Sequence, residues 1–123
     1  MLSALCLGAA VWATDGDSVR CDEHRLRLLG DGVPSVIGID APETHRPKCA
    51  RERALGERAH ARLSELLSVP GVAIQPSGAK DRWGRHLARV WIPVQGGYRT
   101  AGSILLAEGH ARVWTPGSEA NWC

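Results

Sequence analysis

The sequence predicts one small domain that is mainly β (α+β), with two helices and a closed or partly open barrel. Three observations lead to this prediction. The chain has 123 residues, 44% of them hydrophobic, which is enough to bury one core. Its 14 glycines and 7 prolines are spread along the whole chain, which favours many short elements joined by turns. Only one long segment has a helical period, so most other apolar runs are interpreted as strands.

Short strands are expected where apolar residues form brief runs or alternate with polar ones. Asp15-Gly16-Asp17 separates the first two runs, and Asp-Gly between apolar runs is typical of a hairpin. Residues 77–84 are polar and predict a loop, and Gly96-Gly97 predicts a turn. The expected strands span residues 9–13, 18–21, 25–29, 35–39, 72–75, 86–92 and 110–114.

One long helix is expected over residues 50–67, where apolar residues recur at helical spacing and charged residues fill the other positions. Pro70-Gly71 ends this segment. A second, shorter helix is expected after Thr100, a good N-cap residue, with Gly109 at its C-terminal cap.

Charge and hydropathy exclude little by themselves. Fifteen Lys and Arg against thirteen Asp and Glu give a formal net charge of +2, which identifies no partner class. No apolar run reaches 18 residues, so a membrane-spanning helix is not expected. The basic residues are almost all arginine, which suits bidentate recognition of phosphate or carboxylate but also follows from a GC-rich coding sequence.

Residues 1–13 have two interpretations. Their apolar, small residues resemble the end of a secretory signal, although the basic start of such a signal is missing. Alternatively, residues 9–14 are the first strand, and cleavage after Ala13 would remove most of it. We favour export, which predicts a secreted or periplasmic protein with one domain over 9–123.

The four cysteines, at positions 6, 21, 49 and 123, lack the spacing of a zinc site. Oxidised cysteines would agree with export. Cys21, Cys49 and Cys123 are the disulfide candidates, and the sequence leaves their pairing open.

Two acidic motifs, Asp15-Gly16-Asp17 and Asp40-Ala41-Pro42-Glu43, each follow an apolar strand. Carboxylates at the ends of neighbouring strands converge on one rim, where paired carboxylates, a carbonyl and water can bind a hard divalent cation. A further carboxylate there can act as a general base. Arginines such as Arg25, Arg27 and Arg85 are suited to the negative charge of a phosphoryl group, although a solvated strand face explains them equally.

Six motifs occur in the order found in one known family: Asp-Gly-Asp-Ser-Val, Arg-Leu-Leu-Gly, Gly-Ile-Asp-Ala-Pro-Glu, Ala-Arg-Glu-Arg-Ala-Leu-Gly, Asp-Arg-Trp-Gly-Arg and Ile-Leu-Leu-Ala-Glu-Gly-His-Ala. Over about residues 11–114 the chain therefore resembles the staphylococcal nuclease, or thermonuclease, family. This resemblance implies a five-stranded oligonucleotide/oligosaccharide-binding (OB) barrel with packed helices. It also implies a Ca2+-dependent nuclease that cleaves DNA and RNA and leaves 3′-phosphates.

The resemblance also implies the roles of individual residues. Asp17 and Asp40 would be the calcium carboxylates, and the backbone carbonyl of Ala41 a further calcium ligand. Glu43 would be the general base, and Arg85 would bind the phosphate. Arg82 and Trp83 would contact the substrate, although packing explains Trp83 equally well.

The second arginine of the family lies five residues before the acidic motif, where this chain has Ser35. Residues 31–38 look like an insertion. If they loop out, Arg27 keeps the family role; if they replace the end of the strand, the site lacks this arginine. We favour Arg27.

Two other functions are compatible with the sequence. A nonenzymatic OB module that binds nucleic acid or protein would have no use for carboxylates that repel a polyanion. A metal-dependent phosphodiesterase for a small nucleotide would differ only in substrate. We favour a monomeric nuclease for DNA and RNA, with single strands preferred and no stable protein partner.

Overall fold

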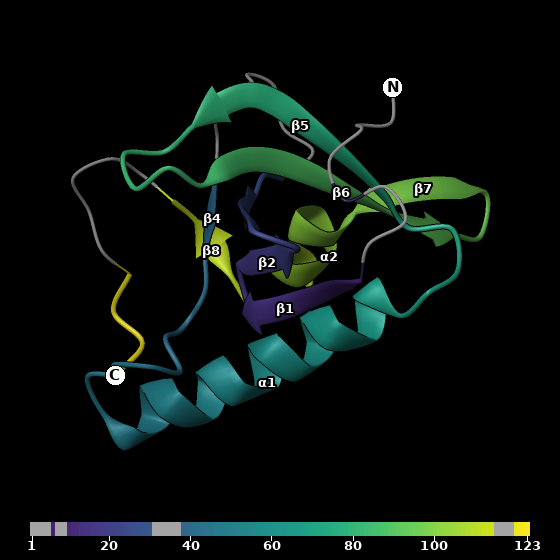
Figure 1. Cartoon of the computed structure of the whole chain (residues 1–123). Helices are drawn as coiled ribbons and strands as arrows, with labels where there is room; N and C mark the ends of the chain where they lie inside the picture. Colours follow the sequence, from purple (N-terminus) through teal and green to yellow (C-terminus); the bar gives the residue numbers. More distant parts are fainter. Residues whose placement is uncertain (1–5, 7–9, 31–37, 115–119) are drawn as a thin grey trace.

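The computed structural model describes residues 6, 10–30, 38–114 and 120–123 (Figure 1). The described elements are, in order, β1 (Val11–Asp15), β2 (Ser18–Cys21), β3 (His24–Leu28), β4 (Ile39–Asp40), α1 (Ala50–Leu67), β5 (Ala73–Lys80), β6 (His86–Val94), β7 (Gly97–Thr100), α2 (Ala101–Ala107) and β8 (Arg112–Val113).

The strands form one large mixed sheet and one small sheet. The large sheet has the order β1-β2-β3-β6-β5, and β7 also pairs with β6. Only β3 and β6 pair in parallel among the described strands; the other pairs are antiparallel. The small sheet joins β4 to β8, with Asp40 opposite Arg112. This mainly β arrangement with two helices confirms the predicted OB-like α+β class.

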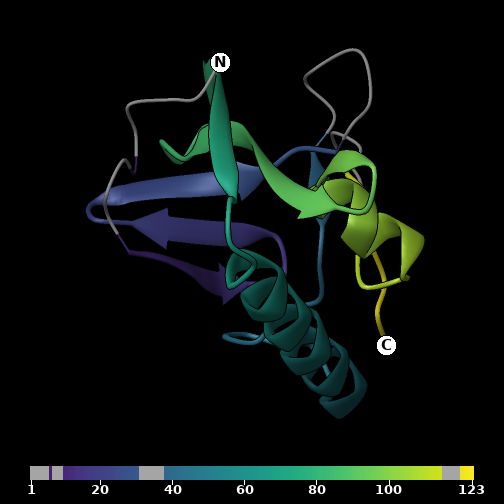
Figure 2. The same ribbon diagram turned by 90° about the vertical axis from the view of Figure 1, so that its right-hand side faces the viewer.

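The core lies between the sheet and the two helices. In Figures 1 and 2, α1 runs along β1, and the C-terminal end of the chain lies beside the start of α1. Gly16, in the β1–β2 turn, packs so tightly on α1 that a Cβ there would lie 2.5 Å from the Cβ of Ala59. Fully buried members of the core include Val19, Leu26, Leu28, Ile39, Leu63, Val90 and Leu105.

Helix α1 confirms the helix predicted over 50–67. Its apolar stripe is buried at Ala59, Leu63 and Leu66, as helical spacing requires. The helix begins after Cys49, whose Sγ accepts a hydrogen bond from the backbone N–H of Glu52 at 3.3 Å. No helix in the described part of the chain is long and apolar enough to cross a membrane.

Helix α2 also follows the prediction. Thr100 is its N-cap, since the Thr100 hydroxyl accepts from the Ser103 N–H at 3.1 Å. Gly109 follows the C-cap with a φ of 79°, the left-handed conformation that favours glycine after a helix. The strand expected over 110–114 is shorter, and only Arg112 and Val113 pair, with β4.

In the second half of the chain, one prediction was wrong and one strand was missed. Residues 77–80, expected in a loop, belong to β5, which continues past Pro76 to Lys80. Strand β5 is the last in the order of the large sheet, and a proline and polar residues are tolerated on an edge strand. Strand β7 was not predicted, because its exposed residues Gly97, Tyr98 and Arg99 have no apolar alternation.

The segment expected as a strand over 35–39 lies partly outside the described residues, which resume at Gly38. Of its described part, only Ile39 belongs to a strand. Gly38 forms an antiparallel bridge with Leu29. This bridge brings together the two ends of the segment that we interpreted as an insertion.

Two disulfides connect the four cysteines. Cys49 bonds to Cys123, two of the predicted candidates. Cys21 bonds to Cys6, which was not among the candidates.

Candidate functional site

Asp17 joins the β1–β2 hairpin to the second acidic motif. Its buried carboxylate accepts a hydrogen bond from the backbone N–H of Ala41 at 3.0 Å through Oδ2, and from the Ser18 hydroxyl at 2.9 Å through Oδ1. Next to it, the Thr44 hydroxyl donates to Asp15 at 2.5 Å. The two acidic motifs, 25 positions apart in sequence, therefore lie side by side as their positions at strand ends predicted.

Glu43 lies at the surface among other acidic groups. Loss of hydration against the surrounding protein raises its pKa from 4.5 to about 7, and Asp15, Asp17, Asp40 and Glu52 add to this shift in that order. The Glu43 side chain itself is exposed, so a solvent molecule or a substrate can reach it. A carboxyl group with a pKa near 7 has the property expected of a general base at neutral pH.

Glu52 is a member of this site that the sequence analysis missed. It is buried, with 5% of the residue exposed, and its carboxylate accepts backbone N–H groups from Glu43 at 3.3 Å and Lys48 at 2.7 Å. Its position three residues after the N-cap Cys49 is that of the glutamate in a capping box. That spacing was the signal in the sequence that would have found it.

Arg27 lies beside the second acidic motif. Its Nη2 donates to the carbonyl of Ile39 at 2.9 Å and is 4.0 Å from the Asp40 carboxylate. The side chain is 12% exposed, and its guanidinium lies 5.5 Å from the centre of the Trp114 ring. The structure thus places Arg27 beside Asp40, while its role in catalysis stays a prediction.

Arg85 is fixed by Asp81. The Arg85 Nε and backbone N–H donate to Asp81 at 2.7 and 2.9 Å. Burial acts to raise the pKa of Asp81, but the hydrogen bonds and charge of Arg85 outweigh this and hold that pKa below its usual value. The Arg85 Nη1 also donates to the Ser18 hydroxyl at 3.2 Å. Since Ser18 donates to Asp17, one hydroxyl connects the arginine to the acidic part of the site.

Trp83 and Arg82 lie in the turn before β6. Trp83 is 56% exposed, and the Arg82 guanidinium lies 4.3 Å from the ring centre. The Trp83 backbone is held on both sides, since its N–H donates to Asp81 at 2.9 Å and its carbonyl accepts from Arg25 at 2.6 Å. The exposure disfavours the packing interpretation of Trp83, and an exposed ring on a fixed backbone suits base stacking.

The predicted calcium ligands, Asp17, Asp40 and the Ala41 carbonyl, all offer oxygen, which is the ligand type that calcium prefers. Within the described ranges, no three His, Cys, Asp or Glu side chains are arranged to hold a metal. A cation here would therefore have two carboxylates, a carbonyl and water. Lost hydration is the main cause of the raised pKa of Glu43, and the nearby charges of Asp15, Asp17 and Asp40 add to it. These carboxylates make the site suitable for a divalent cation in donor type and charge.

A model of the family described as staphylococcal nuclease homologue matches residues 35–121, more than half of the chain. The chain belongs to the staphylococcal nuclease homologue family. The predicted resemblance is confirmed. A comparison with curated proteins finds no match. The family indicates a nuclease-type or nucleic-acid-binding function. The matched region contains Asp40, Glu43, Trp83 and Arg85, whereas Asp17 lies before it and joins the site by geometry alone.

Proposed function

We propose that this protein is a calcium-dependent phosphodiesterase that hydrolyses DNA and RNA and leaves 3′-phosphates. The proposal rests on the proximity of arginine side chains to carboxylates. Arg85 is connected to Asp17 through the Ser18 hydroxyl, and Arg27 lies beside Asp40. Phosphodiester hydrolysis needs both kinds of group, one for the phosphate charge and one for the proton of the attacking water.

Glu43 is the proposed proton acceptor. It takes the proton of the water whose oxygen forms the new bond to phosphorus. The bond between phosphorus and the 5′ oxygen breaks, the 5′ oxygen keeps the electron pair and takes a proton from solvent, and the phosphate stays on the 3′ side. The exposed carboxyl and its pKa of about 7 support this role. Calcium, held by Asp17, Asp40 and the Ala41 carbonyl, would supply positive charge that polarises the phosphate.

Arg27 and Arg85 are proposed to bind the phosphate oxygens. Asp81 fixes the orientation of Arg85, which lowers the entropy lost when the guanidinium binds. The contacts of Arg85 with the described side chains of Asp81 and Ser18 engage Nε and Nη1, so the rest of the guanidinium fork can reach a phosphate. Both arginines then offset the charge that develops in the five-coordinate transition state.

The proposed substrate preference rests on the exposed ring of Trp83. The Trp83 ring is exposed, with the guanidinium groups of Arg82 and Arg85 at 4.3 and 5.6 Å from its centre. Its exposed part offers a surface on which any base can stack, and stacking requires an unpaired base. We therefore propose that single-stranded DNA and RNA are both substrates and that the protein acts as a monomer. We also propose export to the periplasm or the medium, which the Cys49–Cys123 disulfide supports.

A nonenzymatic nucleic-acid-binding module is the second candidate. It is favoured by one observation, that the described residues contain no group of three metal-ligating side chains. The carboxylates of Asp17, Asp40 and Glu43 disfavour it, because they would repel a bound polyanion unless a cation lay between them.

The test is hydrolysis of denatured DNA and of RNA in calcium and in chelator, with Glu43→Gln as the variant. This variant keeps the shape but removes the proton acceptor, so the rate should fall on the order of 10²–10⁴-fold. Glu57→Gln, an exposed glutamate on α1, is the matched control and should be wild-type-like. Binding of single strands without calcium-dependent hydrolysis would favour the module instead.

A further inference from the structure

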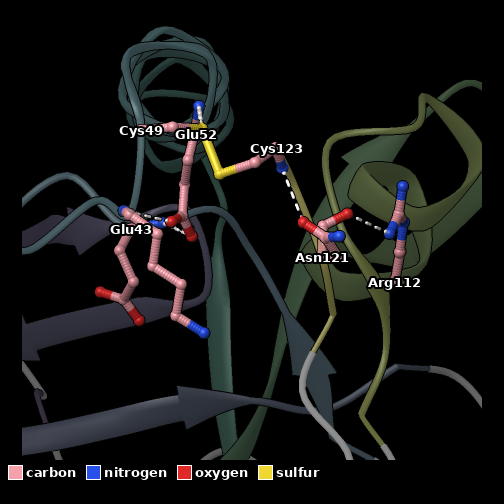
Figure 3. The surroundings of a disulfide bond; sticks show 7 residues. Glu43, Cys49, Glu52, Arg112, Asn121 and Cys123 are labelled. Atoms are coloured by element: carbon pink, nitrogen blue, oxygen red, sulfur yellow. Dashed lines mark hydrogen bonds between the residues drawn. A yellow bond between two sulfur atoms is a disulfide. The ribbon is translucent and has the colours of Figure 1, made fainter.

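The buried carboxylate of Glu52 holds the backbone that carries Glu43. One oxygen accepts the Glu43 N–H at 3.3 Å and the other accepts the Lys48 N–H at 2.7 Å, so both ends of the 43–48 segment meet at this side chain (Figure 3). Only 5% of the Glu52 residue is exposed, so these two N–H groups, and not water, provide the hydrogen bonds that a buried carboxylate needs. The Glu43 side chain itself points away from Glu52 in Figure 3, so the contact fixes the backbone and leaves the carboxyl group accessible.

The start of α1, which positions Glu52, is itself held in place covalently. Cys49 is the N-cap, and its Sγ accepts the Glu52 N–H at 3.3 Å. The same sulfur is bonded to Cys123, 74 residues away (Figure 3). The position of Glu52 therefore depends on where the end of the chain is held.

The end of the chain is held by Arg112. The guanidinium donates to the carbonyl of Asn121 at 3.0 Å and lies 4.2 Å from the ring centre of Trp122, which is buried. Asn121 in turn accepts the Cys123 N–H at 3.0 Å. In the small sheet, Arg112 is the partner of Asp40. A continuous path of contacts thus leads from Asp40, through the C-terminal segment and the disulfide, to the backbone of Glu43.

We infer that Glu52 is a positioning residue for Glu43 and that the Cys49–Cys123 disulfide keeps Glu52 in place. This inference rests on the proposed role of Glu43. The positioning role requires a carboxylate, because both oxygens of Glu52 accept backbone N–H groups. A glutamine has only one acceptor oxygen and would point its own N–H donors toward the second backbone N–H. The 43–48 segment would then lose one of its two attachments.

The first experiment replaces Glu52 by Gln. A small displacement of the base changes kcat and leaves substrate binding alone, so kcat should fall about ten- to a hundredfold with KM unchanged. Amide hydrogen exchange should become faster at Glu43 and Lys48 and stay unchanged in the β6–β7 hairpin. Glu57→Gln is the control, because Glu57 is an exposed glutamate of the same helix paired with Arg53.

The second experiment removes the cross-link without removing the cap. In the double variant Cys49→Ser and Cys123→Ser, the hydroxyl introduced at the N-cap can still accept the Glu52 N–H, since serine is a preferred N-cap residue. Without the cross-link, amide hydrogen exchange at Glu43 should become faster and kcat should fall. The matched control is Cys6→Ser with Cys21→Ser, which removes the other disulfide and should lower stability without changing kcat at a temperature where it is folded.

These results separate the inference from the proposed function. The proposed function stands if the wild-type protein hydrolyses DNA and Glu43→Gln does not. If, in that case, Glu52→Gln keeps a wild-type kcat and slow amide hydrogen exchange at Glu43, the inference about Glu52 is wrong. If the wild-type protein hydrolyses nothing, the proposed function fails, and faster exchange at Glu43 in Glu52→Gln and in the double variant still supports the backbone role. Unchanged exchange in both variants overturns it.

Discussion

Glu43 makes the stability of the native state depend on pH. Its pKa is raised from 4.5 to about 7 on folding, by lost hydration first and by neighbouring carboxylates second. Between these values the native protein keeps a proton that the unfolded chain has released. The stability contributed by this group is therefore complete below about pH 4.5 and is lost as pH rises through about 7.

The first prediction follows for Glu43→Gln in chelator. The free energy of unfolding of the wild type should fall between pH 5 and pH 8 relative to that of the variant, which has no carboxyl to ionise. Because the side chain is exposed, solvent screening reduces the effect to on the order of 1 kcal/mol. Burial lowers the pKa of His86 in the same range, but it does so in both proteins and cancels in the comparison. Denaturant unfolding at several pH values measures the difference, and parallel curves would contradict the raised pKa.

The second prediction concerns the two arginines of β3. Arg27 contacts the carbonyl of Ile39 and lies beside Asp40, whereas Arg25 donates to the Trp83 carbonyl instead. Arg27→Lys should lower turnover about tenfold or more, because lysine is a point charge without the bidentate fork. Arg25→Lys should leave turnover close to that of the wild type. Turnover at saturating calcium measures both, and equal, wild-type-like rates would mean that Arg85 is the arginine of the site.

At the scale of the elements, the contact between α1 and the second acidic motif leaves no room for a side chain. A Cβ at Gly56 would lie 2.8 Å from the Pro42 carbonyl and 2.9 Å from the Glu43 carbonyl. The third prediction is that Gly56→Ala destabilises the protein by about 1–3 kcal/mol, although alanine is the better helix former by about 1 kcal/mol. Ser64→Ala, at an exposed position of the same helix, provides the comparison without the clash. Thermal unfolding checks both, and a Gly56→Ala protein at least as stable as Ser64→Ala would contradict this packing.

The elements of the fold differ in how far the amino-acid sequence predicts them. Helix α1 was predictable because its apolar stripe faces the core and its ends carry local signals. The second half of β5, residues 77–80, and most of strand β7 were not, because they are exposed and backbone hydrogen bonds, not side-chain alternation, determine their structure. In the site, the motifs predicted which carboxylates and arginines approach one another. Glu52 was missed although it lies three residues after the N-cap Cys49, because cysteine is not a typical N-cap residue and the partners of Glu52 are backbone N–H groups.

At the scale of the whole molecule, the proposed site is where separate parts of the chain meet. Asp17 comes from the β1–β2 hairpin, Asp40 from the small sheet, and Arg85 from the start of β6. Negative charge in this region opposes folding when no cation is present, and after lost hydration the neighbouring carboxylates add to the rise in the pKa of Glu43. A cation that binds only the folded protein should therefore stabilise the entire domain and not one loop.

The last prediction is that calcium raises the melting temperature. At a calcium concentration of about 100 times Kd, binding should raise the free energy of unfolding by about 2.7 kcal/mol. For a domain of this size, each kcal/mol raises the melting temperature by roughly 4 °C. Asp40→Asn should abolish the increment together with activity, because Asn keeps the size of the side chain but removes the charge. Asp22→Asn, an exposed residue of the β2–β3 turn, is the control and should retain it. Differential scanning calorimetry in calcium and in chelator measures the change. If calcium raised the melting temperature of Asp40→Asn as much as that of the wild type, the cation would bind away from the acidic motifs. Arg27 and Arg85 alone would then have to neutralise the charge of the phosphate.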